Sequence, residues 1–351
     1  MYDELQEQLR EARAQGTTLI PMGAGSKRDW LPPREGKTLS LAGISGIIDY
    51  QPSELVIRAR AGTPLREIET TLAERNQMLA SEPPTLDGRS TLGGAVACGW
   101  SGPRRPWAGA LRDQVLGVTM LNGTGELLRF GGSVIKNVAG FDVSRLMTGS
   151  MGTLGVILEA NLKVVPRPPV DIVLALECGQ AEGIRRANQA SASAIPLAGA
   201  AWEAGVLRLR LSGAAAGVAV GRDILGGEED HDGLAWFDAL RHFRHALFGQ
   251  PAPGMILWRL SLPQAAPPLL VGYPQLVDWA GGQRWLLAHV EASSIVQAAA
   301  SAAGGNASMR RVGTPWPPHT PLNPTIAALQ QRLKRAFDPA GLFGNHLPPF
   351  A

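Results

Sequence analysis

Apolar residues recur at two different spacings in the N-terminal half of the chain, and each spacing predicts its own kind of element. Leu5, Leu9 and Ala12 follow one another at three- and four-residue intervals, which predicts an amphipathic helix over residues 3–15 that ends at Gly16. Short apolar runs bounded by turn residues predict strands instead. We expect strands at residues 17–21, 47–50, 55–59, 115–121, 126–130 and, with room for a bend, 153–165.

Turn residues place further boundaries between these elements. The tetrapeptide Asn-Gly-Thr-Gly at 122–125 lies between two expected strands and predicts a hairpin. The dipeptide Thr63-Pro64 precedes apolar residues at helical spacing, so a helix should begin there with proline at its first position. Residues 83–112 have no clear period and are rich in glycine and proline, which predicts extended binding loops.

The character of the sequence changes at residues 166–169 (Pro-Arg-Pro-Pro), beyond which alanine-rich helices alternate with strands and glycine-rich loops become fewer. A second break, Thr-Pro-Trp-Pro-Pro at 314–318, precedes a helical pattern over 325–337. A chain of 351 residues is long enough for two separate cores. We therefore expect three parts, residues 1–168, an α+β domain over 169–313 and a C-terminal segment over 314–351.

Composition and charge narrow the functional classes. The formal net charge is only +3 and basic residues are scattered, so the electrostatic footprint of a nucleic-acid-binding protein is missing. No apolar run approaches the ~18 residues of a membrane span, and the acidic, polar N-terminus resembles neither a signal nor a transit peptide. Cys98 and Cys178 are too far apart for a disulfide framework or an iron–sulfur cluster within the chain, which favours a cytoplasmic location.

All six histidines lie at position 231 or later. His242 and His245 stand three residues apart on an expected helix, a spacing that suits a pair of metal ligands. No acidic or histidine partner lies at a useful spacing from them, so we favour a solvated helix face and expect no metal site.

Glycine is unusually abundant, at 42 of 351 residues, and is concentrated in four loops at 23–26, 83–97, 131–142 and 148–157. Gly23-Ala-Gly-Ser26 follows an expected strand and would let amide groups turn toward an anion. A Rossmann fingerprint fails because Arg28 stands at its third glycine position, and no Walker loop sequence occurs. An ordinary turn explains any one loop, whereas an elongated ligand such as FAD explains all four together.

The four loops, in this order and spacing, resemble the FAD-binding fold of vanillyl-alcohol oxidase-type (PCMH-type) flavoproteins. Residues 94–107, with their proline–arginine segment, residues 112–117 and residues 136–146 resemble more specifically the FAD-binding small subunit (E subunit) of bacterial glycolate oxidase. Residues 278–285 and 337–343 extend the likeness over nearly the whole chain. The resemblance implies an α+β fold: a two-subdomain PCMH-type FAD-binding domain, then an α+β cap-like domain and a C-terminal helix.

The resemblance also assigns residues to the cofactor, mostly small ones whose backbone can approach it closely. Those assigned to the pyrophosphate are Gly23, Ala24, Gly25 and Ser26, joined in the same cavity by Thr91, Gly93 and Gly94. Those assigned to the flavin are Gly99 and Gly102, and those assigned to the adenine-ribose side are Gly149, Gly152, Thr153 and Val156.

Three departures from the family pattern change the expectations. The histidine that covalent members carry beside the first glycine loop is missing here, where Ser26-Lys27 follows Gly25, so we expect non-covalent FAD. The cap domain lacks the histidine-rich base or metal site of catalytic hydroxy-acid members, so the catalytic residues remain unknown. The tail at 344–348 reads Gly-Asn-His-Leu-Pro rather than the family's Asn-Pro-Gly.

Two pairs of polar residues stay open to more than one interpretation. Lys136 and Asn137 would place a cation near the flavin, or Lys136 would pair with Asp142 across a turn. Arg104 and Arg105 would clamp a substrate carboxylate, or would lie in a solvated loop or a subunit contact.

Three functions follow from these features. The favoured one is an FAD-binding subunit of a glycolate oxidase complex, relaying electrons or supporting catalysis beside a larger FAD subunit and an iron–sulfur subunit, in the cytoplasm or at the inner face of its membrane. Trp107, beside arginine and proline residues, is the best candidate for a subunit contact. The second is an autonomous 2-hydroxy-acid dehydrogenase, which needs a base with a pKa near 7. The third is a flavin-fold scaffold without a cofactor.

Overall fold

The computed structural model describes residues 2–132, 142–313, 316 and 324–344. Its strands are β1 (Leu19–Met22), β2 (Lys37–Ser40), β3 (Ile47–Gln51), β4 (Val56–Arg60), β5 (Gln77–Met78), β6 (Val115–Leu121), β7 (Leu127–Gly131), β8 (Val156–Lys163), β9 (Val165–Pro166), β10 (Val170–Glu177), β11 (Leu197–Glu203), β12 (Val206–Gly213), β13 (Glu228–Glu229), β14 (Met255–Ser261), β15 (Gln275–Asp278), β16 (Gln283–His289) and β17 (Asn306–Val312).

The helices alternate with these strands along the described parts of the chain. The α-helices are α1 (Tyr2–Ala14), α2 (Leu65–Ala73), α3 (Leu92–Cys98), α4 (Arg105–Ala108), α5 (Leu111–Gln114), α6 (Val143–Met147), α7 (Gln180–Ser191), α8 (Ala215–Leu225), α9 (Gly233–Arg241), α10 (Ser293–Ala302) and α11 (Pro324–Phe337). Short 3-10 helices are η1 (Arg28–Trp30), η2 (Ala246–Phe248), η3 (Trp279–Gly281) and η4 (Val290–Ala292).

The N-terminal part of the chain is built on an antiparallel five-stranded sheet with the strand order β3-β4-β8-β6-β7. Its apolar face packs against α2 and α3, where Leu65, Ile68 and Val96 are fully buried. The smaller parallel pair β1-β2 packs with α1 beside it, burying Leu5 and Leu9. The helix, strands and hairpin expected from the apolar spacing are thereby confirmed, with Pro64 at the N-cap rather than at the first position of α2.

The expectation of extended loops over residues 83–112 is wrong, because α3 and α4 lie in this segment and α5 begins within it. The α3 sequence Leu-Gly-Gly-Ala-Val-Ala-Cys has low helix propensity, which hides the helix from pattern analysis. Close packing selects it instead: a Cβ on Gly93 would lie 2.6 Å from the Cβ of Ala61. The helix begins with a side-chain cap, since Thr91 accepts a hydrogen bond from the Gly94 amide.

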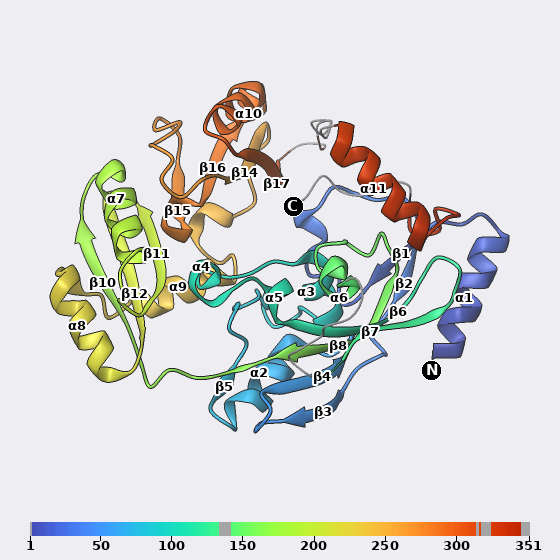
Figure 1. Cartoon of the computed structure of the whole chain (residues 1–351). Helices are drawn as coiled ribbons and strands as arrows, with labels where there is room; N and C mark the ends of the chain where they lie inside the picture. The colour runs from blue at the N-terminus through green and yellow to red at the C-terminus, as the bar shows by residue number, and fades with distance from the viewer. Residues whose placement is uncertain (1, 133–141, 314–315, 317–323, 345–351) are drawn as a thin grey trace.

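The second region, residues 170–313, contains an eight-stranded sheet with the order β13-β10-β12-β11-β15-β16-β14-β17. Side chains alternate between its faces, as the pleat requires. Leu174 and Trp258 point to the face covered by α7, α8 and α10. Val173 and Trp285 point to the other face, where they pack with α9 and with Trp30 of the first region. This second face is therefore turned toward the N-terminal part of the chain (Figure 1).

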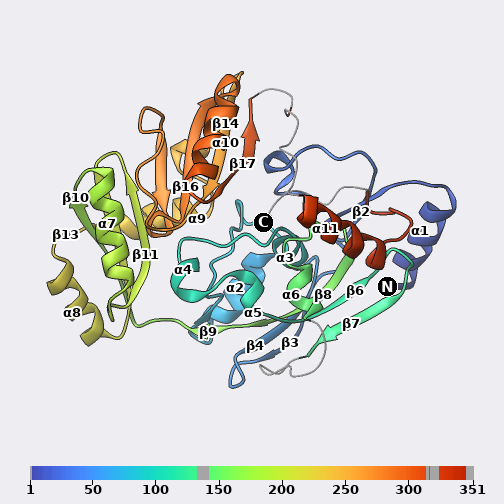
Figure 2. The same ribbon diagram turned by 45° about the horizontal axis from the view of Figure 1, so that its top comes forward.

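The last helix returns to the N-terminal part, and Figures 1 and 2 show α11 close to α1 and the β1–β2 pair. The Lys334 Nζ donates a hydrogen bond to the Thr153 carbonyl, and the Leu19 amide donates to the Leu342 carbonyl. In the described part of the chain, the helices are all too short or too polar to cross a membrane. The division into domains at 168/169 and 313/314 stays a prediction.

Candidate flavin site

A cavity of about 400 Å³ lies where β1 ends, and the first glycine loop forms one of its walls. Within the described residues, no hydrogen bond is donated by the amides of Ala24, Gly25 and Ser26. Gly25 has a φ of +66°, the left-handed conformation that turns successive amides toward one side. Consecutive amides in such a turn form a cradle for an anion, so the loop fits the pyrophosphate of FAD.

The opposite wall leaves no room for larger side chains near this loop. A Cβ on Gly23 would lie 2.2 Å from the Thr91 hydroxyl oxygen. Most of the residues assigned to the cofactor line this one cavity, namely Gly23, Ala24, Gly25, Ser26, Thr91, Gly93, Gly94 and Gly152. The loops at 23–26, 83–97 and 148–157 therefore meet around a common space, as the sequence analysis expected.

Lys27 is a member of this cavity that the sequence analysis did not single out. Its side chain is buried and donates a 2.8 Å hydrogen bond to the hydroxyl of Ser90. Burial lowers the pKa of Lys27, and burial likewise raises the pKa of the neighbouring Cys98 thiol. Among the described residues Lys27 has no carboxylate partner, and a cation beside the amides of the glycine loop adds to the attraction for a phosphate. In the sequence, the position of Lys27 directly after the first glycine loop was the feature that could have indicated this role.

A second cavity, of about 450 Å³, adjoins the first, and Cys98 and Met151 line both. Gly99, Gly102 and Gly149 line the second cavity. The two spaces together offer an elongated site of the kind that FAD needs.

Two of the residues assigned to the cofactor line neither cavity. Thr153 is fully buried and donates its hydroxyl to the Ser150 carbonyl, at 2.6 Å. Val156 packs in the core beside α1 and β2. Their assignment to the adenine-ribose side of the cofactor stays a prediction.

The far wall of the larger cavity is the second sheet face, and it carries polar groups that the sequence analysis missed. Asp278 is buried, and it accepts hydrogen bonds from the Trp279 amide (2.7 Å) and from Gln283 Nε2 (3.3 Å). The Oε1 of the same Gln283 accepts a 2.6 Å bond from Arg259 Nε. Burial raises the pKa of Asp278 to about 7. Arg310, from the next strand, lines the same wall.

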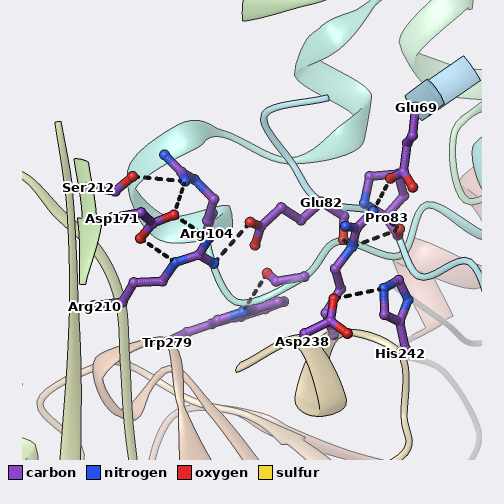
Figure 3. A network of polar contacts seen from close by, with 12 residues as sticks. Glu69, Glu82, Pro83, Arg104, Asp171, Arg210, Ser212, Asp238, His242 and Trp279 are labelled. Atoms are coloured by element: carbon purple, nitrogen blue, oxygen red, sulfur yellow. Dashed lines mark hydrogen bonds and ion pairs between the residues drawn. The ribbon is translucent and has the colours of Figure 1, made fainter. Parts of the chain in front are cut away.

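Arg104 serves as a contact between the two regions (Figure 3). It is buried, donates to the hydroxyl of Ser212 at 3.2 Å and lies 3.8 Å from the Asp171 carboxylate. Arg210 joins this network, bound to Asp171 at 2.7 Å and to Glu82 at 2.9 Å. A solvated loop is therefore the wrong interpretation for Arg104. The Asp171 carboxylate offsets its charge, so Arg104 is not placed to clamp a substrate carboxylate.

Arg105 and Trp107 have different surroundings although they are close in sequence. Arg105 is exposed at the rim of the larger cavity, with its guanidinium 4.5 Å from the centre of the Trp279 ring. Trp107 packs partly buried against the core of the second region. The contact that Trp107 makes in this structure is thus within the chain.

The two histidines singled out as a possible metal pair lie just after α9, and their interpretation as a solvated helix face is wrong. His242 Nδ1 accepts a hydrogen bond from the Thr85 amide at 3.1 Å, which ties α9 to the N-terminal part. His245 pairs with Glu203 at 2.9 Å. Burial lowers the pKa of His242 to about 4, so it is neutral at physiological pH. Figure 3 shows His242 beside Asp238.

Other expected residues fall on parts of the chain that the structure leaves undescribed. Lys136 and Asn137 lie outside the described residues, as do most of the third glycine loop and the tail from 345 onward. Within the described residues, no group of three or more histidine, cysteine, aspartate or glutamate side chains is placed to hold a metal ion.

Comparisons with known proteins agree with this geometry. The family model described as an FAD binding domain matches residues 2–131. The glycolate oxidase subunit GlcE of Escherichia coli is 41% identical over 339 residues, which span 97% of this chain and 95% of that protein. A D-2-hydroxyglutarate dehydrogenase of Xanthomonas citri pv. viticola is 30% identical over 175 residues, 49% of this chain and 37% of that protein.

Among solved structures, alkyldihydroxyacetonephosphate synthase superposes with a TM-score of 0.70 at 17% identity, over 98% of this chain and 76% of that one. This likeness confirms the fold that the four glycine loops predicted. An identity of 41% over nearly the full length of both proteins shows the family as well as the fold. The chain belongs to the GlcE family of glycolate oxidase subunits and carries an FAD binding domain over residues 2–131.

Proposed function

We propose that this chain is an FAD-binding subunit of a glycolate oxidase complex that converts glycolate to glyoxylate. The observation that carries the proposal is the cradle of unbonded amides at Ala24–Ser26 in a chain 41% identical to GlcE. A phosphate-binding cradle would have little purpose in a scaffold that had lost its cofactor, so the third function is disfavoured.

The residues of the smaller cavity would hold the cofactor non-covalently. The amides of the first glycine loop and the charge of Lys27 would bind the pyrophosphate, while Gly93 and Gly94 allow the backbone to come close. Bound FAD supplies the chemistry of the complex, since it accepts electrons in pairs and passes them on singly. The protein's own contribution is to fix the cofactor across two adjoining cavities and to exclude water from them.

Onward electron transfer requires other polypeptides. Cys98 lies at the cavities and Cys178 in the second region, and two such cysteines cannot provide the four ligands of a usual iron–sulfur cluster. We therefore infer a larger FAD-containing subunit that oxidises glycolate and an iron–sulfur subunit that takes up the electrons. The complex would lie in the cytoplasm or at the inner face of the cytoplasmic membrane.

The autonomous 2-hydroxy-acid dehydrogenase remains the second candidate, because the larger cavity contains Asp278, a carboxyl group whose pKa is about 7. An anaerobic reduction experiment separates the two. The chain is expressed alone, loaded with FAD and mixed with glycolate or D-lactate, and its flavin absorption is followed. We expect the band to persist alone and to bleach in the reconstituted complex. Rapid bleaching without any partner would show that this chain is itself the dehydrogenase.

A further inference from the structure

The first half of α11 exposes apolar side chains that continue a row packed against the protein. Phe337 packs partly buried on the core of the five-stranded sheet, and Leu333, one turn earlier, is half-buried at the larger cavity. Leu329 and Ile326 extend the same row at helical spacing, yet they are 52% and 46% exposed. The apolar face of the helix therefore runs from the core, past the cavity, into solvent.

This exposed row lies at the mouth of the larger cavity. The lining there comes from four helices, namely Gln330 and Leu333 of α11, Leu146 of α6, Arg105 of α4 and Arg112 of α5. Arg105 and Arg112 are exposed, whereas Leu146 and Leu333 are half-buried. A molecule seated on α11 would thus also cover the opening of the cavity.

The charge around the exposed row is mostly positive. Arg332 follows Leu329 by three residues, on the flank of the row, and Arg335 comes three residues later; both are exposed, and α11 contains no acidic residue. Among the residues that the structure describes, neither arginine pairs with a carboxylate. The two exposed arginines of α4 and α5 add to this charge, and the exposed Asp113, 4.0 Å from one of them, offsets it only in part.

An apolar centre flanked by arginines is typical of a protein interface. The cores of interfaces are apolar and enriched in arginine, and an exposed apolar patch often marks an interaction site. The row on α11 is short, which suits the small interfaces of electron-transfer complexes.

The position of the row and its charge indicate the class of partner. Gly99 and Gly102, which are assigned to the flavin, line this same cavity. Electron transfer between cofactors weakens steeply with distance, so an acceptor must approach the flavin where its cavity opens. An iron–sulfur cluster held by four thiolates is anionic, and a basic mouth complements the field around it.

We propose that Ile326, Leu329 and Arg332, which together form the α11 face, are the docking surface for the iron–sulfur subunit of the complex. That subunit would present an apolar centre with acidic flanks and would bring its cluster to the mouth of the larger cavity. The inference rests on the proposed function for the existence of this subunit and for the flavin. The exposed row and its charge depend on neither.

Binding of the FAD-loaded chain to the iron–sulfur subunit, measured by surface plasmon resonance at low and high salt, tests the α11 face. We expect Leu329→Glu to raise the dissociation constant about 10- to 100-fold, the range for a central interface side chain. Arg332→Glu should raise it about tenfold at low salt and less at high salt, because salt screens charge pairs. Both positions are exposed and glutamate is a good helix former, so α11 should persist in both variants.

Two control variants make the same changes away from the α11 face. Ile224→Glu alters an apolar side chain of α8 that is 66% exposed, and α8 lies at the opposite end of the molecule from α11 (Figures 1 and 2). Arg75→Glu reverses an exposed charge just after α2, outside the lining of both cavities. Both controls should bind like the wild type.

The remaining outcomes would each overturn the proposal. Equal binding by the wild type, Leu329→Glu and Arg332→Glu would do so, as would a loss that Ile224→Glu shares. The same measurement with the larger flavin subunit must show no effect of Leu329→Glu, since an effect there alone would assign the face to the wrong subunit. Sedimentation of the chain by itself tests a second copy as occupant, and a dimer that Leu329→Glu dissociates would contradict the proposal.

The flavin absorption of the same samples keeps this test separate from the proposed function. A colourless chain that binds the iron–sulfur subunit through the α11 face would refute the FAD assignment and leave the docking surface standing. A yellow chain whose binding ignores changes in the α11 face would refute the docking surface alone. A wild-type chain that binds neither subunit would refute the complex and the docking surface together.

Discussion

Asp278 illustrates how a single residue acquires chemistry from its surroundings. Its carboxyl group is buried among Trp279, Gln283 and Arg259, and burial outweighs the hydrogen bonds that favour its charged form. The nearby charge of Glu82 raises its pKa further, whereas the charge of Arg259 lowers it. Nothing in the local sequence Val-Asp-Trp-Ala marks this aspartate as unusual.

A pH dependence of stability follows from the pKa of about 7 at Asp278. In the unfolded chain an aspartate ionises near its ordinary pKa of about 4, so between pH 4 and 7 the folded protein holds a proton that the unfolded chain has released. The contribution of this group to the free energy of unfolding should therefore fall as the pH rises from 4 to 7 and level off above 7. Urea denaturation between pH 5 and 8 measures this, and an unchanged slope in Asp278→Asn would exclude Asp278 as the titrating group.

The first glycine loop allows a direct test of the phosphate cradle. Gly25→Glu would place a negative charge beside the phosphates, and one like-charge pair at ~4 Å costs about 4 kcal/mol at an effective dielectric constant near 20. FAD affinity should fall by roughly three decades, as measured from the flavin content after dialysis. Gly16→Glu is the matched control, because Gly16 has a φ of +64° and open space around it, outside both cavities. Full flavin occupancy in Gly25→Glu would contradict the placement.

The residues of the cradle could be predicted and those of the second cavity wall could not, for a physical reason. Gly23–Ser26 form a contiguous turn after a strand, so the whole signal lies within one short segment. Arg259, Asp278 and Arg310 come from three strands and meet only through their register and one bulge. Sequence periodicity indicates which residues share a face of a strand, but it does not indicate which strands are neighbours.

At the scale of elements, helices with strong amphipathic spacing were predictable and helices selected by packing were not. The helix α1 was expected within a residue or two of its observed limits. By contrast, α3 contains two adjacent glycines and packs so closely on Ala61 that a Cβ on Gly93 would lie 2.6 Å from the Ala61 Cβ. The expected helix also included His242 and His245, whereas α9 ends at Arg241. The His242 side chain instead accepts a hydrogen bond from the Thr85 amide and so takes part in the contact between the regions.

The end of α11 depends on one buried ion pair. The Lys334 Nζ lies 2.6 Å from the Asp338 carboxylate, which also accepts the amides of Leu342 and Phe343. Asp338→Ala would leave a buried lysine without its anion, so we expect a loss of about 3–5 kcal/mol in the free energy of unfolding. Urea denaturation measures it. Glu182→Ala, which removes an exposed pair on α7, should leave the midpoint almost unchanged. Equal shifts in the two variants would argue against the role of Asp338.

The whole molecule is held together across the site by polar contacts between its two regions. Arg210 bridges Glu82 of the first region and Asp171 of the second, and the Trp279 indole donates to the Gly102 carbonyl at 3.1 Å. These contacts fix the sheet face that carries Arg259 against the glycine loops. The larger cavity between them therefore forms only when the two regions dock, which explains why the motifs predicted residues of the first cavity but not the far wall of the larger one.

We expect the whole protein to hold its flavin without a covalent bond. Covalent members of the superfamily carry a histidine beside the first glycine loop, and this chain has Ser26 and Lys27 there. Acid precipitation of the yellow protein should therefore release all of its flavin into the supernatant. Flavin that stays with the precipitated protein after washing would show a covalent bond.

The central claim is that this chain binds its own FAD, and the visible spectrum of the purified chain tests it most directly. After incubation with FAD and removal of the excess, the account predicts a flavin band at about one cofactor per chain. The same band should be absent from Gly25→Glu prepared in parallel. A wild-type chain that folds but stays colourless after the same treatment would contradict the account.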